Sequence, residues 1–424
     1  MKKIKKIKDG LISRQIGVAK LALKTGKSLY ESREFDLQNK LKKSFGPHID
    51  QIVNELGVMK GPLMKGGQLL ATMGASFLPQ EAIDILKSLE NKTNYLAWSE
   101  IKKQIPVEFI NELEIEEEAM AAASLGQVHL AKYQNKKYAL KIQYKGVKRA
   151  IKNDMRVLKM LMKVLNIIPK SIDLSEIYNE IEQMLHDETN YLKEAESTKK
   201  FKTLLSPYSY FKIPDIFDRF SNDKILCSEF LDGHGLHDLD ELNLGQDERN
   251  ILGREFMRLL FLEIFHFDQV QTDVHMGNYI ILPDLKWGLI DFGACKSPPS
   301  EFMDGYRKLL IACAYQNKQS FFETLYEMGY LSKVEETNEE FFWEYACIIG
   351  APFQESSYDW GQSNIAQNVF DYAPRLIKEV KIGNPPRHSL FLDRKIAGVY
   401  FVLQKLECSF DVKGLLEDTL NKKL

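Results

Sequence analysis

The chain has 424 residues and a formal net charge of −2 at pH 7, and 44% of its residues are hydrophobic. This length and composition suit a globular protein of two or three domains, or a two-lobed enzyme with an extension. The near-zero charge gives no argument for nucleic-acid binding, and five dispersed cysteines argue for a reducing compartment and against a disulfide framework or a zinc site.

The first 30 residues are strongly basic and lack the continuous apolar core of a secretory signal peptide. Isoleucine, leucine and valine recur among the lysines, a pattern that indicates a basic, partly amphipathic helix. Two interpretations stay open, attachment to an anionic lipid surface or a solvated helix end. No apolar run reaches the roughly 18 residues of a membrane-spanning helix. We therefore expect a cytoplasmic protein, peripheral on the inner face of a membrane.

Residues 1–114 are predicted to form this basic N-terminus and a helical extension, because apolar residues recur at helical spacing over Ile49–Met59 and Glu81–Leu89. Within the extension, the adjacent glycines Gly66 and Gly67 interrupt an apolar helix. A glycine inside a helix costs roughly 1 kcal/mol relative to alanine. The pair therefore indicates a local requirement for glycine at this point.

Residues 115–232 are predicted to form a small β-rich lobe. Two alternating apolar runs flank a turn at Gln134–Lys136, which indicates a hairpin, and Lys141 lies on the second run. A helix is expected over Ser175–Leu205, capped near its start, and it carries Glu194. Alone, the lysine reads as an edge charge and the glutamate as a solvated helix face. In this order they match a lysine that binds the α- and β-phosphates of ATP and the helix carboxylate that holds it.

An alanine-rich segment precedes the hairpin where a protein kinase carries a glycine-rich loop over the nucleotide. It reads Ala121, Ala122, Ala123, Ser124. Alanine restricts the backbone more than glycine does, so we expect a stiffer loop that binds nucleotide differently. The alternative interpretation of three alanines is a tight packing site.

Residues 233–424 are predicted to form a helical lobe that contains one hairpin, joined at Pro283-Asp284. Asp273 and Asn278 lie on a loop just before the hairpin, and Asp291 follows it in the triplet Asp-Phe-Gly. Phosphoryl transfer from magnesium-bound ATP needs oxygen ligands for the cation and a carboxylate that orients or deprotonates the acceptor. Kinase-like folds supply these groups in this order and spacing. The alternative is a loop whose Asp and Asn merely cap turns.

Together, the motifs resemble the UbiB/AarF family of atypical protein-kinase-like proteins, and within it the ubiquinone-biosynthesis ATPases. The resemblance runs from about Ile49 to the end of the chain and includes the segment LFLDRKIAGVYFVLQKLE. It implies an α+β, two-lobed protein-kinase-like fold with the helical N-terminal extension packed over the active-site cleft. There the Lys-x-Gly-Gln motif occupies the space of a protein substrate. The resemblance thus implies that Gly66 and Gly67 mark a close approach that lets Lys65 and Gln68 face the nucleotide site.

The resemblance also implies residue roles. Lys141 is the nucleotide lysine with Glu194 as its partner, and Asp273 is the catalytic-loop aspartate. Lys65 and Gln68 are counted with the catalytic residues. The expected nucleotide-binding set is Ala121, Ala122, Ala123, Ser124, Lys141, Glu194 and the hinge residues Ser228, Glu229, Phe230 and Leu231. The expected magnesium ligands are Asn278 and Asp291, and the accessory residues are Glu188 and Asn190.

The chain departs from the family pattern at two places. Asn190 stands where the family has an aspartate after Glu188, so a metal or lysine contact made there should weaken. The catalytic loop reads Gln271-Thr272-Asp273-Val274-His275-Met276-Gly277-Asn278 and lacks the prolines that stiffen it in the family.

The predicted function is an atypical ATPase that binds ATP or ADP with Mg²⁺ and supports isoprenoid-quinone synthesis or related membrane-lipid handling. One alternative is a nucleotide-binding, lipid-associated pseudoenzyme without turnover, and another is an ordinary small-molecule or protein kinase. The expected partners are the nucleotide, a quinone precursor or other lipid, an anionic membrane surface and a second copy of the chain.

Overall fold

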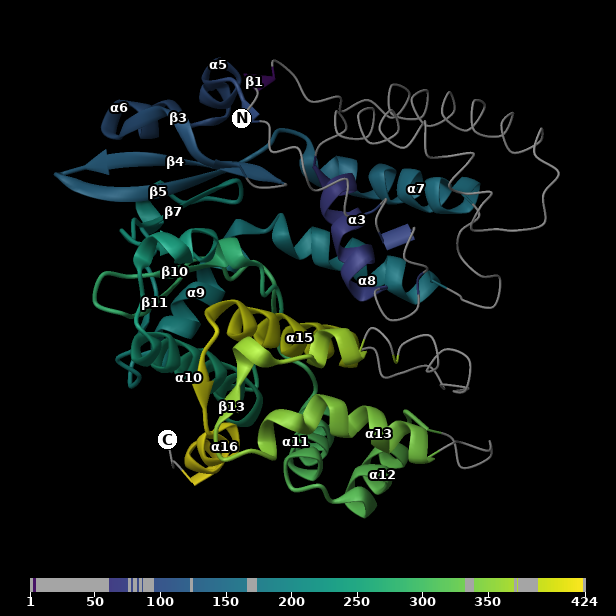
Figure 1. The fold of residues 1–424 in the computed structure, drawn as a ribbon. Helices are drawn as coiled ribbons and strands as arrows, with labels where there is room; N and C mark the ends of the chain where they lie inside the picture. Colours follow the sequence, from purple (N-terminus) through teal and green to yellow (C-terminus); the bar gives the residue numbers. More distant parts are fainter. Residues whose placement is uncertain are drawn as a thin grey trace. The chain divides into compact units, whose positions relative to one another are not determined.

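The computed structural model describes residues 3–4, 61–74, 78, 82–83, 86, 95–122, 125–165, 174–331, 339–369, 372 and 388–421. The helix expected over Ile49–Met59, most of that over Glu81–Leu89 and nearly all of the basic N-terminus lie outside these residues. The chain divides into two compact units (Figure 1). The first unit comprises residues 1–196 and 215–230, and the second comprises 197–214 and 231–424.

The first unit contains a four-stranded antiparallel sheet with helices around it. Its strands and helices are β1 (Lys3–Ile4), α3 (Pro62–Met73), β2 (Tyr95–Leu96), α5 (Trp98–Ile101), α6 (Val107–Glu112), β3 (Glu114–Ala122), β4 (Gly126–Tyr133), β5 (Lys136–Gln143), α7 (Val147–Leu165), α8 (Ser175–Glu188), α9 (Tyr191–Leu205) and β7 (Ile225–Glu229). The strand order in the sheet is β3-β4-β5-β7, and helix α9 continues from this unit into the second.

The predicted hairpin is confirmed as β4 and β5. Gly126 pairs with Gln143 at the open end, and Tyr133 pairs with Lys136 next to the turn. The connecting residues Gln134 and Asn135 have φ values of +48° and +62°. Two consecutive left-handed residues form the type of two-residue turn that matches the twist of an antiparallel pair. This register places Lys141 opposite Val128 on one side and Leu226 of β7 on the other.

Helix α3, which carries the two glycines, packs on α7 and α8 (Figure 1). A Cβ atom added at Gly66 would lie 3.1 Å from Met155 Sδ and 3.6 Å from a methyl group of Leu185. The buried carboxylate of Asp154 in α7 accepts a hydrogen bond from the Leu63 N–H, at 3.1 Å, and so caps the first turn of α3. The close approach expected at Gly66 is thus made to two helices of the same unit.

The expected continuous helix over Ser175–Leu205 is wrong in one respect, because it is broken at Thr189 and Asn190 into α8 and α9. The Thr189 hydroxyl donates to the His186 carbonyl at 2.8 Å, and Asn190 Oδ1 accepts from the Lys193 N–H at 3.2 Å. Short polar side chains that bond to nearby backbone compete with helix hydrogen bonds, which explains the break.

The second unit is mainly helical. Its strands and helices are β6 (Phe211–Lys212), β8 (His234–Gly235), α10 (Gln246–Leu262), β9 (Val270–Gln271), β10 (Tyr279–Ile281), β11 (Trp287–Leu289), β12 (Cys295–Lys296), α11 (Ser300–Ala314), α12 (Lys318–Glu327), α13 (Glu339–Gly350), β13 (Tyr358–Asp359), α15 (Ser389–Leu406), β14 (Ser409–Phe410) and α16 (Val412–Asn421). The predicted hairpin around Pro283-Asp284 is confirmed as β10 and β11.

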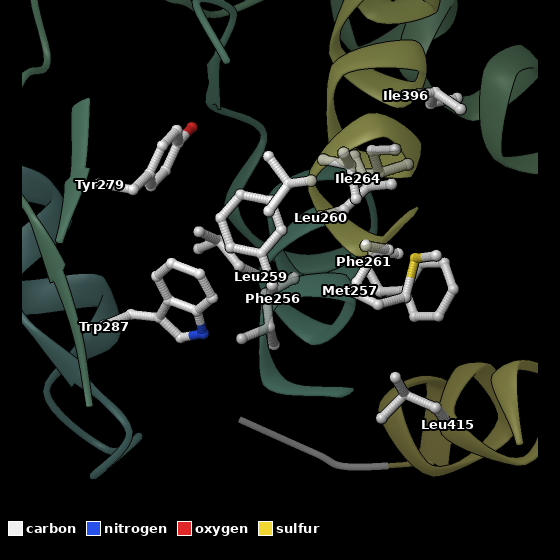
Figure 2. Packing of buried hydrophobic residues seen from close by; sticks show 14 of the residues in the cluster. Phe256, Met257, Leu259, Leu260, Phe261, Ile264, Tyr279, Trp287, Ile396 and Leu415 are labelled. Atoms are coloured by element: carbon white, nitrogen blue, oxygen red, sulfur yellow. The ribbon is translucent and has the colours of Figure 1, made fainter. Parts of the chain in front are cut away.

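The core of the second unit forms where α10 meets α15, α16 and the hairpin (Figure 2). Phe256 of α10 packs against Tyr279 and Trp287, with ring centroids 4.9 and 4.7 Å away. The Trp287 indole N–H donates to the Leu252 carbonyl at 2.9 Å, which satisfies the polar atom of a fully buried side chain. This core holds the hairpin, and with it the loops at its two ends, against α10.

Candidate active site

The first unit brings Lys141 and Glu194 together, 53 residues apart in the chain. The Lys141 ammonium donates to both carboxylate oxygens of Glu194, at 2.7 and 3.0 Å, and lies 5.2 Å from the centre of the Tyr191 ring. Glu194 is almost completely buried, whereas Lys141 is about one-fifth exposed. A buried carboxylate is stable beside a cation, so the pair fixes the direction of the lysine on the sheet.

The break between α8 and α9 positions this ion pair. Gln143, at the end of β5, donates to the Thr189 carbonyl at 3.0 Å, which ties the lysine strand to the break. Tyr191 and Glu194 lie in the first turn of α9, which starts directly after the break. Gly126 lies close by, because a Cβ there would meet the Tyr191 hydroxyl at 2.8 Å and the Ile142 carbonyl at 2.5 Å. Only glycine fits between β5 and α9 at this point.

Lys65 and Glu188 form a second ion pair of the first unit, at 3.2 Å, with both side chains largely buried. Glu188 is the last residue of α8, so the two ion pairs stand on either side of the same helix break. Gln68 lies one turn beyond Lys65 on α3 and is partly exposed. Asn190, the other accessory residue, is exposed and caps α9 through Lys193.

The alanine-rich segment differs from the expected loop. Ala121 and Ala122 lie in β3 and pair with Val128 and Gln127, so the loop does not begin at Ala121. Ala123 and Ser124 lie outside the described residues. Of the expected hinge, Ser228 and Glu229 end β7, Phe230 is the last residue of the first unit, and Leu231 belongs to the second.

In the second unit, a side-chain amide joins the catalytic loop to the Asp-Phe-Gly segment. Gln271 Nε2 donates to the carbonyl of Asp273 at 2.8 Å and to that of Asp291 at 3.3 Å. Its oxygen accepts from the buried Tyr279 hydroxyl at 3.0 Å. His275 Nδ1 accepts from the Gly277 N–H at 3.1 Å and so holds the loop backbone. These bonds order the loop that lacks the family prolines.

Asn278 and Asp291 fit a hard cation by their chemistry. The Asn278 amide nitrogen donates to the Asp273 carbonyl at 2.9 Å, which leaves its oxygen as the ligand atom. One oxygen of Asp291 accepts from the Gly293 N–H at 3.0 Å, and the Ile290 N–H donates to the Asn278 carbonyl at 3.1 Å. An amide oxygen and a carboxylate are ligands that Mg²⁺ prefers, with waters and phosphates completing its shell.

Helix α15 adds charged residues that the motifs did not identify. The guanidinium of Arg394 forms an ion pair with the Asp273 carboxylate, with Nη2 2.9 Å from Oδ1. Lys395 pairs at 2.7 Å with Glu263, where both side chains are 1% exposed, and Glu263 also accepts from the Gln271 N–H. The available signal was a charged triplet, Asp393-Arg394-Lys395, inside an apolar helix. No pattern in the sequence identifies the partners of this triplet. Asp273 lies 121 residues from Arg394, and Glu263 lies 132 residues from Lys395.

Comparisons with known proteins show the family of the chain. The sequence profile of the family described as the ABC1 atypical kinase-like domain matches residues 88–325. The atypical kinase COQ8 of Saccharomyces cerevisiae mitochondria is 27% identical to this chain over 388 residues. The alignment covers 89% of this chain and 77% of the COQ8 sequence. The mitochondrial atypical kinase COQ8B of Danio rerio is also 27% identical, and the alignment covers 88% of this chain and 61% of the COQ8B sequence. The chain therefore spans only part of each relative.

A solved structure shares the fold. The structure described as the complex of Rv3197 with erythromycin from Mycobacterium tuberculosis aligns with a TM-score of 0.60 at 21% identity, over 92% of this chain and 100% of that one. With the profile match, it confirms the predicted α+β, kinase-like fold. In the part of the chain that the structure describes, no helix is both long and apolar enough to cross a membrane.

Proposed function

The chain belongs to the ABC1 atypical kinase-like family, as the resemblance to UbiB/AarF proteins implied, and from this premise we propose that it is an ATPase that binds Mg²⁺ with ATP or ADP. The observation that carries the proposal is the Lys141–Glu194 ion pair, which the kinase-like fold uses to orient the α- and β-phosphates.

The remaining roles follow from the chemistry of each group. Asn278 and Asp291 would hold Mg²⁺, which would supply positive charge to neutralise the phosphates. Asp273 orients the attacking water and accepts its proton. The Lys65–Glu188 pair holds the Lys-x-Gly-Gln helix in place, which favours water over a protein substrate as the acceptor.

The test is magnesium-dependent ATP hydrolysis and ADP binding by the full chain. We expect Asp273→Asn to lower kcat by a factor of about 10² to 10⁴, the usual contribution of a general base. Asp291→Asn should abolish magnesium-dependent ADP binding. Asp284→Asn, in the exposed β10–β11 turn, is the matched control and should change neither. Absence of magnesium-dependent nucleotide binding by the wild type would contradict the proposal.

The pathway assignment is the finer part of the proposal. We propose that hydrolysis supports isoprenoid-quinone synthesis or related lipid handling, because the relatives named above are COQ8 proteins. Turnover should rise with anionic liposomes or with phenolic mimics of quinone precursors. Lys65→Ala should alter that response, because it removes the ion pair with Glu188. Unchanged turnover with every lipid and phenol would exclude this assignment.

Membrane contact is proposed to be peripheral, through the basic N-terminus. The wild type should sediment with anionic liposomes, and deletion of Met1–Lys27 should abolish sedimentation. Sedimentation that survives the deletion would show that this stretch is not the anchor.

A second candidate is a nucleotide-binding pseudoenzyme, which the ion pair between Asp273 and Arg394 favours. The Asp273 oxygen that accepts from Arg394 is occupied and cannot take the proton of an attacking water. This candidate predicts binding without turnover. Steady hydrolysis that disappears in Asp273→Asn would exclude it.

A further inference from the structure

The Arg394 side chain is 8% exposed, and only part of its hydrogen-bonding capacity is used. Nη2 donates to Asp273 Oδ1 at 2.9 Å. Nη1 is buried and has no hydrogen-bond partner among the described residues. A buried donor without an acceptor costs free energy, and more so when it carries charge. The position of this cost, beside the catalytic-loop aspartate, indicates that an acceptor arrives with a ligand.

The surrounding contacts hold Arg394 in place. On the same helix, Lys395 is fixed by Glu263, and the Asp393 carboxylate accepts from the Tyr306 hydroxyl at 2.7 Å. Gly398, one turn further on, touches Val274 of the catalytic loop so closely that a Cβ there would lie 2.6 Å from Val274 Cβ. These contacts fix α15 against the loop and hold the guanidinium beside Asp273.

We propose that Arg394 binds the terminal phosphoryl group of the nucleotide, with Nη1 donating to a phosphate oxygen while Nη2 keeps Asp273 in place. The inference rests on the proposed function, since the ligand is the nucleotide of that site. A planar guanidinium offers two separate donors in a fixed fork, whereas a lysine offers a point charge. The group that is attacked must come next to the aspartate that orients the acceptor, and the arginine beside that aspartate is placed for its charge.

This role gives Arg394 a specific signature. ADP lacks the terminal phosphate, so its affinity should not depend on the arginine. A non-hydrolysable ATP analogue such as AMP-PNP carries the phosphate and should lose one charge-assisted hydrogen bond when the arginine is removed. That loss corresponds to a factor of about ten or more in affinity.

The experiment compares magnesium-dependent binding of ADP and AMP-PNP to the full chain by calorimetry. Arg394→Gln should weaken AMP-PNP about tenfold or more and leave ADP within about twofold. Arg394→Lys keeps the positive charge in case the glutamine variant does not fold, and it should also weaken AMP-PNP selectively. Asp273→Asn should retain the wild-type ratio of the ADP and AMP-PNP affinities, because it leaves the guanidinium of Arg394 unchanged. Arg254→Gln, at an exposed pair with Asp418, is the matched control and should change neither.

Equal weakening of both nucleotides would assign Arg394 a structural role and overturn the inference. Unchanged AMP-PNP affinity in the folded Arg394 variants would also overturn it. A wild type that binds neither nucleotide would instead defeat the proposed function. If the wild type binds both nucleotides and the Arg394 variants do not discriminate between ADP and AMP-PNP, only this inference is overturned.

Discussion

His129 in β4 is fully buried, and its two ring nitrogens have different partners. The Gln127 amide is oriented by Leu96, whose N–H donates to its oxygen at 3.0 Å and whose carbonyl accepts from its nitrogen at 3.3 Å. The same nitrogen therefore presents an N–H to His129 Nε2 at 2.9 Å. Nδ1 lies 2.7 Å from the Glu116 carbonyl and must be the protonated nitrogen. The network thus accepts only the neutral imidazole.

This network predicts a stability that depends on pH. Burial lowers the pKa of His129 below its ordinary value of 6.5, although the Glu116 carbonyl acts in the opposite direction. As pH falls below 6.5 the unfolded chain binds a proton that the folded chain resists, so the free energy of unfolding falls with pH. We expect His129→Gln to be less stable than wild type at pH 8, with the difference narrowing towards pH 5 in urea titrations. A constant difference across this range would contradict the prediction.

At the scale of elements, the parts predictable from the sequence were those with a local cause. The β4–β5 hairpin follows from alternating apolar residues on either side of a predicted turn at Gln134–Lys136, and the loop with Asp273 and Asn278 follows from its motif. The break between α8 and α9 was missed, because helical periodicity continues across Thr189 and Asn190 while their side chains cap locally. The partners of Arg394 were not predictable either, since tertiary packing of α15 chooses them and no periodicity encodes that choice.

The contact between α15 and the catalytic loop gives a prediction at this scale. A methyl group at Gly398 would overlap Val274, whose β-branched side chain is stiff, so the loop must shift. We expect Gly398→Ala to cost about 1–3 kcal/mol of unfolding free energy, as overpacking usually does, and to lower kcat because Asp273 adjoins Val274. Urea denaturation and the ATPase assay measure the two effects.

The matched control is Gly350→Ala, where the nearest atom would lie at an ordinary 3.4 Å. This residue ends α13, and we expect no loss of stability or turnover there. A Gly398→Ala protein with wild-type stability and wild-type kcat would show that the close contact does not position the loop.

At the scale of the whole molecule, the chain passes between the two units at residues 196–197, 214–215 and 230–231. The residues proposed to hold the nucleotide and Mg²⁺ are also distributed over the two units. Lys141 and Glu194 belong to the first unit, and Asp273, Asn278 and Asp291 belong to the second. A nucleotide that binds only the folded chain stabilises the fold by mass action.

We therefore expect Mg²⁺ with ADP to raise the Tm of the chain in differential scanning calorimetry. At a free concentration of 100 times Kd the gain is about 2.7 kcal/mol, enough to raise Tm by several degrees. Removing the cation with EDTA should reverse the shift. Lys141→Met and Asp291→Asn should each abolish it, although each substitution lies in only one unit. A shift that survives either substitution would show that the substituted residue does not hold the nucleotide.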